Sequence, residues 1–147
     1  MKNIFTLPAY VGIILKNKNK ILLVQRNNSD WMSDYWNFPG GLLEENETLT
    51  TAAVREIYEE VNANVNQTDF TLQHVLHVHK NEKNTKDIIG FYFMAETWQG
   101  TIINKEPDKH SNVQWFDINN LPDNITEHAL LAIDSIKTNK KYSENGW

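Results

Sequence analysis

One segment of the sequence, residues 48–61, combines the apolar repeat of a helix with a cluster of carboxylates. Its apolar residues recur every four positions and so share one face of a helix: Ala53, Ile57 and Val61. Three glutamates lie elsewhere on the same cylinder: Glu56, Glu59 and Glu60. Like charges at this spacing destabilise an isolated helix by about 0.2–0.5 kcal/mol per pair. The chain is therefore expected to form a helix, capped by Thr48, that packs against a core and carries concentrated negative charge.

Segments with strand-like composition precede and follow this helix. Runs rich in apolar, β-branched and aromatic residues predict strands at 9–15, 21–25, 70–80, 88–98 and 113–118. The first two are joined by the polar sequence KNKNK and are expected to form a β-hairpin. A second helix is predicted over residues 125–138, and the polar residues 139–147 are expected to fray. No repeat or linker interrupts the chain, so residues 1–147 are predicted to form a single α/β domain.

The composition excludes several kinds of site and partner. The chain has no cysteine, which excludes disulfides and thiolate chemistry and suits the reducing cytoplasm that we expect as its location. The sequence contains neither a signal peptide nor an apolar run of the roughly 20 residues that span a bilayer, so no membrane partner is expected. The net charge of −5 argues against nucleic-acid binding. An acidic protein that binds a polyphosphate needs a cation between the two, and a metal ion would serve.

The carboxylates belong to a longer pattern with fixed spacing. The sequence FPGG, residues 38–41, lies upstream and lets the main chain approach a ligand closely. Five residues separate Gly41 from Glu47, and seven more separate Glu47 from Arg55, which begins the run REIYEE. This pattern resembles the signature of the Nudix hydrolases, Gly-x5-Glu-x7-Arg-Glu-aliphatic-x-Glu-Glu-x-Gly-aliphatic, and matches it through Glu60. The resemblance implies a Nudix-type α/β/α sandwich with a mixed central β-sheet, and it implies that the chain is an enzyme.

Metal binding gives the glutamate spacing a physical reason. Taken alone, three glutamates on a helix are more often a solvated face. Magnesium, however, prefers oxygen ligands and is commonly held by a few carboxylates together with substrate phosphates. A bound ion would neutralise the crowded charge and lower the pKa of a water molecule whose proton a carboxylate could accept. The expected cofactor is Mg²⁺, with Mn²⁺ as the alternative.

The resemblance also implies a role for each residue of the pattern. It implies that the metal ligands are Glu56, Glu59, Glu60 and the carbonyl group of Gly41. Glu56 is the favoured residue for activating water, although the identity of the general base is left open. Arg55 belongs to the catalytic set as the residue that orients the carboxylates, with Gly40 and Glu47 in the structural part of the pattern. An ordinary helix-surface ion pair between Arg55 and Glu59 is the alternative for that pair.

The sequence departs from the family pattern directly after Glu60. Where the pattern has glycine and an aliphatic residue, this chain has Asn62 and Ala63. Glycine after a helix usually adopts the left-handed conformation, and asparagine is the next most tolerant residue there. We therefore predict a helix that ends near Asn62 and a site that keeps its chemistry.

Within the family, the sequence is most similar to MutT-type nucleoside-triphosphate pyrophosphohydrolases. Glu106, in KEPDK, matches a loop carboxylate that binds metal or acts as a base in those enzymes, and a solvated loop glutamate is the alternative. Asn124, in LPDN, matches a residue that reads the edge of a purine, and a helix N-cap is the alternative.

Two further polar residues are expected to bind substrate. Arg26, after the second predicted strand, is either a phosphate or nucleotide contact or a plain surface residue. Asn37 offers an amide donor and acceptor to a base, although turn geometry explains it equally well. Trp36, Phe91 and Phe93 could stack on a base, but aromatic residues at strand spacing are more often core.

These features together predict Mg²⁺-dependent hydrolysis of a small nucleotide. The expected substrate is a nucleoside triphosphate, ordinary or oxidised, that is cleaved to the monophosphate and pyrophosphate. The alternatives are ADP-ribose or another nucleotide sugar, or a non-catalytic Nudix module that only binds nucleotide. Monomer and homodimer both remain open.

Overall fold

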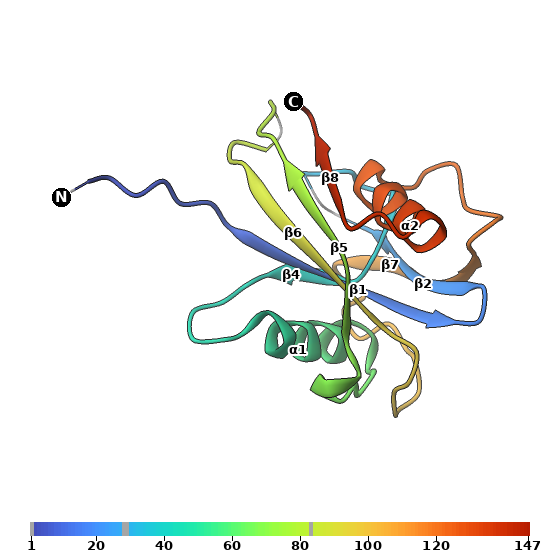
Figure 1. Cartoon of the computed structure of the whole chain (residues 1–147). Coiled ribbons are helices and arrows are strands. Elements are labelled where there is room, and N and C mark those ends of the chain that lie inside the picture. The colour runs from blue at the N-terminus through green and yellow to red at the C-terminus, as the bar shows by residue number, and fades with distance from the viewer. Residues whose placement is uncertain (1, 28–29, 83) are drawn as a thin grey trace.

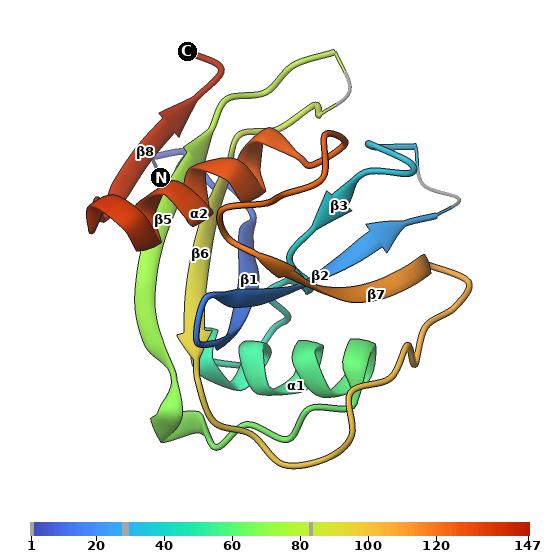
Figure 2. The same ribbon diagram turned by 90° about the vertical axis from the view of Figure 1, so that its right-hand side faces the viewer.

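The computed structural model describes residues 2–27, 30–82 and 84–147, and it places one helix on each face of a central sheet (Figures 1 and 2). The helices are α1 (Leu49–Val61) and α2 (Glu127–Thr138), with a 3-10 helix η1 (Gln67–Asp69) between them in the chain. The strands are β1 (Ala9–Asn17), β2 (Lys20–Arg26), β3 (Trp36–Asn37), β4 (Gly40–Leu42), β5 (Thr71–Val78), β6 (Ile88–Ala95), β7 (His110–Asp117) and β8 (Tyr142–Asn145). The predicted α/β/α sandwich is confirmed. Among the described residues, no helix is long and apolar enough to cross a membrane.

The sheet is mixed, as predicted, and β1 lies at its centre. The strand order is β3-β2-β1-β6-β5-β8, with β4 paired to β1 and β7 paired to β2. The pairs β1–β6 and β5–β8 are parallel, and the other pairs are antiparallel. The expected hairpin of β1 and β2 is present but pairs only beside its turn, at Lys16–Ile21 and Asn17–Lys20, because β1 continues along β6 while β2 turns to β3 and β7.

Alternate residues of the central strands pack into two cores, one under each helix. On β1, Val11, Ile13 and Leu15 face the core of α1, whereas Ile14 faces the core of α2. Helix α1 contributes its predicted apolar stripe, Ala53, Ile57 and Val61, together with Ala52. Helix α2 contributes Ala129, Ala132 and Ile133. Burial on both faces explains why the central strands are continuously apolar in sequence.

The expectation that the C-terminal residues fray is wrong. Residues Tyr142–Asn145 form β8, which pairs in parallel with β5. The buried side chain of His74 fastens this segment, since its Nδ1 lies 2.8 Å from the carbonyl oxygen of Lys140 and its Nε2 lies 3.0 Å from Oγ of Ser143. The single-domain organisation of residues 1–147 stays a prediction.

Candidate active site

Helix α1 is fixed at both ends by local hydrogen bonds. The Thr48 side chain accepts a hydrogen bond from the main-chain N–H of Thr51 at 3.2 Å, and the Thr48 N–H donates to the Thr51 hydroxyl at 2.8 Å, which forms a capping box. Asn62 ends the helix in the left-handed conformation, with φ 65° and ψ 22°. Both predictions about the ends of this helix are confirmed, and the glutamates occupy its last two turns.

Arg55 connects the helix to the loop before it. Its Nη2 and Nε donate to the two carboxylate oxygens of Glu47 at 2.7 and 3.0 Å, and its Nη1 donates to Glu56 Oε1 at 2.8 Å. The hydrogen bonds from Arg55 lower the pKa of Glu47. Arg55 Nη1 also donates to Glu59 Oε2 at 3.4 Å, so the ordinary helix-surface ion pair is present. This is the longest of the hydrogen bonds from Arg55 to carboxylates. The guanidinium therefore fixes the orientation of Glu56 from a rigid attachment to Glu47.

Glu60 is the most buried of the helix glutamates. Only 5% of this residue is exposed, and its Oε2 accepts a hydrogen bond from the main-chain N–H of Gly40 at 3.1 Å. Burial, and then the nearby Glu56 carboxylate, raise the pKa of Glu60 well above its ordinary value. Burial also raises the pKa of Glu56. Two acidic groups thus lie together in a site that disfavours their charged forms.

The two glycines of FPGG allow strand β4 to pack against these carboxylates. A Cβ atom on Gly41 would overlap the carboxylate of Glu56, and a Cβ on Gly40 would overlap the carbonyl oxygen of Val11. Any larger residue at position 41 would therefore push Glu56 out of its place.

A cavity of about 360 Å³ opens between β4, α1 and the start of β7. Its lining includes Glu56, Glu60, Gly40 and Gly41 on one side and Asp108, Lys109 and His110 on another. Glu59 is not among the lining residues, because its side chain lies beside Arg55 and is 47% exposed. The structure thus brings Glu56 and Glu60 together in the cavity wall, whereas the Glu59 side chain lies outside the cavity.

Glu106 lies on the loop that leads into β7. The loop is attached to α1 by the N–H of Lys105, which donates to the carbonyl oxygen of Glu60 at 3.0 Å. The Glu106 Oε2 atom is buried and forms an ion pair with Lys109 Nζ at 3.2 Å, and Glu106 is not among the residues that line the cavity. A metal ion at this oxygen would therefore have to take the place of the Lys109 ammonium group.

The residues at the cavity fit a hard divalent cation. Among the described residues, no three carboxylate or imidazole side chains converge into a complete metal cage. Magnesium seldom uses such a cage, because it keeps several waters and takes further oxygens from substrate phosphates. The crowded carboxylates of Glu56 and Glu60 supply suitable donors, and the Glu106 carboxylate lies near enough to raise the pKa of Glu60.

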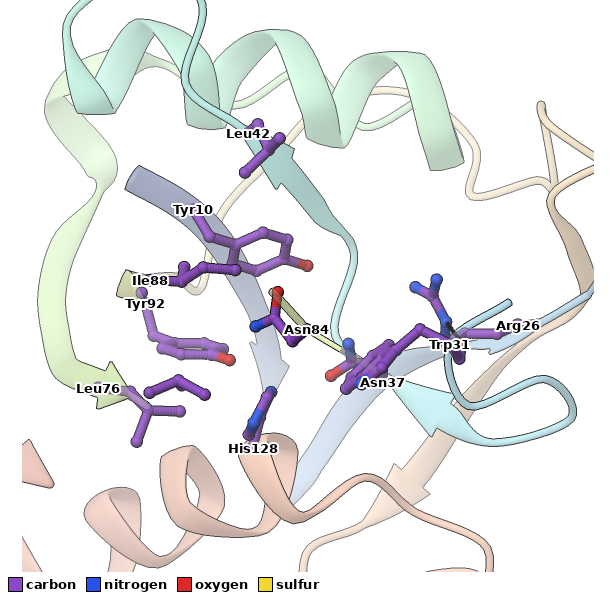
Figure 3. Close-up of a pocket in the computed structure, with 12 residues that line it drawn as sticks. Tyr10, Arg26, Trp31, Asn37, Leu42, Leu76, Asn84, Ile88, Tyr92 and His128 are labelled. Atoms are coloured by element: carbon purple, nitrogen blue, oxygen red, sulfur yellow. Dashed lines mark hydrogen bonds between the residues drawn. The ribbon is translucent and has the colours of Figure 1, made fainter. Parts of the chain in front are cut away.

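A second cavity of about 390 Å³, shown in Figure 3, adjoins the first. Tyr10 and Arg26 line both cavities. Its walls are mainly apolar and aromatic and include Tyr92, Trp31, Leu76 and Ile88. Trp31 stacks on His128 with ring centroids 5.4 Å apart, and the Arg26 guanidinium lies 4.8 Å from the Trp31 ring. Asn37 and Asn84 add amide groups to the same walls. An apolar cavity with a few fixed polar groups is the usual form of a small-molecule site.

The residues predicted to bind substrate differ in where they lie. Arg26 stands at the junction of the two cavities, so it is not a plain surface residue. Asn37 is 4% exposed and lines the second cavity, where its Oδ1 accepts a hydrogen bond from the Thr126 hydroxyl at 3.0 Å. Asn124 is not among the residues that line either cavity, and its Nδ2 donates to the carbonyl oxygen of Asp34 at 2.6 Å. Its alternative as a helix cap is wrong, because Thr126 caps α2.

The aromatic residues that line the second cavity, Tyr10, Trp31 and Tyr92, are not among the predicted site residues. Trp36 and Phe93 are core residues, both 7% exposed, and Phe91 packs against the core, as their strand spacing indicated. Tyr92, only 2% exposed, belongs to the core under α2 and also lines the cavity, and a Cβ on Gly12 of the neighbouring strand would collide with its ring. A glycine inside a strand was the sequence signal for this close approach.

A family model described as the NUDIX domain matches residues 6–136. The chain belongs to the Nudix family. This Nudix hydrolase is 34% identical, over 65% of its length, to a protein named 8-oxo-dGTP diphosphatase from Buchnera aphidicola subsp. Schizaphis graminum, of which it covers 68%. The chain is also 30% identical to a protein named ADP-ribose pyrophosphatase from Methanocaldococcus jannaschii. That alignment covers 88% of this chain and 72% of the relative.

The fold of this Nudix hydrolase is also close to that of a solved structure. The crystal structure of the MutT NUDIX hydrolase from Burkholderia pseudomallei superimposes with a TM-score of 0.81 at 26% identity, over 88% of this chain and 97% of that one. The family that the spacing of the glutamates indicated is therefore confirmed.

Proposed function

We propose that this Nudix hydrolase cleaves a nucleoside triphosphate, ordinary or oxidised, to the nucleoside monophosphate and pyrophosphate with Mg²⁺ as its cofactor. The observation that carries the proposal is the junction of two unlike cavities at Tyr10 and Arg26. The apolar cavity suits a nucleobase, and the cavity of Glu56 and Glu60 suits a metal-bound polyphosphate. The relative named 8-oxo-dGTP diphosphatase supports the same substrate class.

The metal would be held by Glu56, Glu60 and the carbonyl oxygen of Gly41, with Glu59 and Glu106 as further ligands and Mn²⁺ as the alternative ion. When bound, the ion supplies charge neutralisation for the phosphates and a lowered pKa for a coordinated water. Glu59 would have to turn inward from its position beside Arg55 to take part.

The side chains of this chain then orient and deprotonate the attacking water. Arg55, held by Glu47, keeps the Glu56 carboxylate in one orientation through its 2.8 Å hydrogen bond. Glu56, which lines the cavity and is oriented by Arg55, would accept the proton of the water. Glu106 is the alternative base on the loop before β7.

The second cavity would fix the nucleoside. The Thr126 hydroxyl engages Oδ1 of Asn37, so the Asn37 amide group is held in one orientation and its Nδ2 can donate to the edge of a base. Arg26 would meet the phosphates where the two cavities join. Asn124 would act on the base only after its hydrogen bond to Asp34 is released.

A nucleotide sugar is the second candidate substrate, because a relative named ADP-ribose pyrophosphatase aligns with most of the chain. The acidic net charge favours a free nucleotide over a nucleic acid as the partner. The cytoplasmic location and the choice between monomer and homodimer stay predictions.

A substrate panel with Mg²⁺ tests the proposed function. Purified protein is incubated with dGTP, 8-oxo-dGTP, the four common nucleoside triphosphates and ADP-ribose, and the products are resolved by chromatography. We expect pyrophosphate and a nucleoside monophosphate from at least one triphosphate. Cleavage of ADP-ribose alone would favour the second candidate. Absence of any cleavage, with nucleotides still raising the melting temperature, would identify a binding module instead.

A further inference from the structure

Asn62 stands where the Nudix pattern has glycine, and its side chain makes a contact that glycine lacks. The residue is left-handed, and its main-chain N–H donates to the carbonyl oxygen of Tyr58 at 3.0 Å. Its Nδ2 donates to the carbonyl oxygen of Thr101 at 3.1 Å, 39 residues further along the chain. Glycine would adopt the same main-chain conformation more readily but would lose this second hydrogen bond.

The segment 99–105 runs alongside the C-terminal end of α1, and several main-chain hydrogen bonds join the two (Figure 2). The main-chain bonds are Asn64 N to Gln99 O at 2.8 Å, Gln99 N to Asn64 O at 2.9 Å, Ile103 N to Val61 O at 3.1 Å, and Lys105 N to Glu60 O at 3.0 Å. The side chain of Asn62 supplies the bond in the middle of this series, at Thr101. The two turns also fit closely, since a Cβ on Gly100 would lie 2.6 Å from the carbonyl oxygen of Asn62.

This attachment sets the position of Glu106. Glu106 follows Lys105 directly, in a loop that has no helix or strand until β7 begins at His110. The loop closes on itself through Asn104, whose Oδ1 accepts from the Glu106 N–H at 3.2 Å and whose Nδ2 donates to the carbonyl oxygen of His110 at 2.7 Å. A loop that is rigid within itself moves as a unit, so its anchorage on α1 decides how far Glu106 lies from Glu60.

We propose that Asn62 is a positioning residue for the metal site. Its side chain holds the segment 99–106 against α1 and so keeps the Glu106 carboxylate beside Glu60. The inference rests on the proposed metal site. The family pattern has glycine at position 62, so glycine would be expected to suit this site best, and the inference predicts the opposite. Restoring the glycine at position 62 weakens metal binding rather than improving the helix end.

The test compares Asn62→Gly with a matched control on the other helix. Asn139 ends α2 in the same left-handed conformation, with φ 60° and ψ 22°, and lines neither cavity. Asn139→Gly therefore makes the same main-chain change but leaves the hydrogen bond from Asn62 to Thr101 intact. A third variant, Asn62→Asp, keeps the size of the side chain but turns a donor toward Thr101 into an acceptor. The first readout is hydrogen exchange at the Ile103 and Lys105 amides in metal-free protein. The second is the dissociation constant for Mn²⁺, measured by electron paramagnetic resonance of the free ion.

We expect exchange at these amides to accelerate and the Mn²⁺ dissociation constant to rise, each by about two- to tenfold in Asn62→Gly. Asn62→Asp should change both at least as much, and Asn139→Gly should change neither. Faster exchange with unchanged Mn²⁺ binding would overturn the positioning role and show that the hydrogen bond from Asn62 to Thr101 only stabilises the segment. Unchanged exchange would overturn the inference at its first step. If the unaltered protein binds no Mn²⁺, the proposed metal site fails and the positioning role falls with it.

Discussion

Arg55 donates to both carboxylate oxygens of Glu47, at 2.7 and 3.0 Å, and the same guanidinium donates to Glu56 at 2.8 Å. The cation of the sequence motif is therefore fully engaged with carboxylates. Its contribution is to hold Glu56 in one orientation, and the cationic group that lines both cavities is instead that of Arg26.

Arg55→Lys should lower the turnover number by at least about tenfold, because a lysine cannot donate to Glu47 at two points and still reach Glu56. The melting temperature should fall only slightly, since Arg55 lies outside both cores. Steady-state kinetics with saturating Mg²⁺ provide the measurement. A turnover number within twofold of the unaltered enzyme would show that the bidentate contact does not matter for Glu56.

Gly41→Ala should abolish most activity, because its Cβ would occupy the space of the Glu56 carboxylate. The matched control is Gly146→Ala, whose Cβ would make only ordinary contacts with His79, at 3.6 Å and beyond. That glycine has a positive φ of 84°, so the control measures how the fold tolerates backbone strain far from the site. Activity and melting temperature are compared for both. An active Gly41→Ala enzyme would show that Glu56 is free to move without consequence.

His74 predicts a pH dependence of stability. Burial lowers its pKa below the ordinary value near 6.5, so the unfolded chain takes up the proton first as the pH falls. The stabilisation is thus complete above about pH 6.5 and is lost as the pH falls from there through the folded-state pKa. Urea unfolding at pH 7.5 and pH 5.0 in EDTA should show this loss, and His74→Gln should reduce the difference. An equal pH dependence in the two proteins would assign the effect to groups other than His74.

The parts of the molecule that follow from local sequence could be predicted. Helix α1 depends on an apolar repeat, a capping threonine and an asparagine that tolerates the left-handed conformation, and all three are visible within residues 48–62. The metal-site hypothesis rests on the same short stretch together with Glu47, the upstream glycine pair and Glu106.

The parts that depend on distant pairing could not be predicted. Strand β8 is short and polar, and it exists because β5 offers an edge and His74 offers two hydrogen bonds from 66 and 69 residues away. Likewise the period-two pattern of a strand does not tell which face also borders a cavity, so the sequence does not reveal that Tyr10 and Tyr92 line one. The orientation of Glu59 depends on the conformation of Arg55, which no sequence pattern specifies.

Pyrophosphate release from a nucleoside triphosphate by Glu56→Gln tests the central claim most directly. The substitution removes a charge from the cavity and keeps the size of the side chain, and Glu45→Gln makes the same change on an exposed loop residue as the control. With Mg²⁺ present, we predict that Glu56→Gln loses at least about a hundredfold in turnover while its melting temperature stays near that of the unaltered protein. Glu45→Gln should keep full activity. Turnover by Glu56→Gln close to that of the unaltered enzyme would contradict the role of Glu56 and the site built around it.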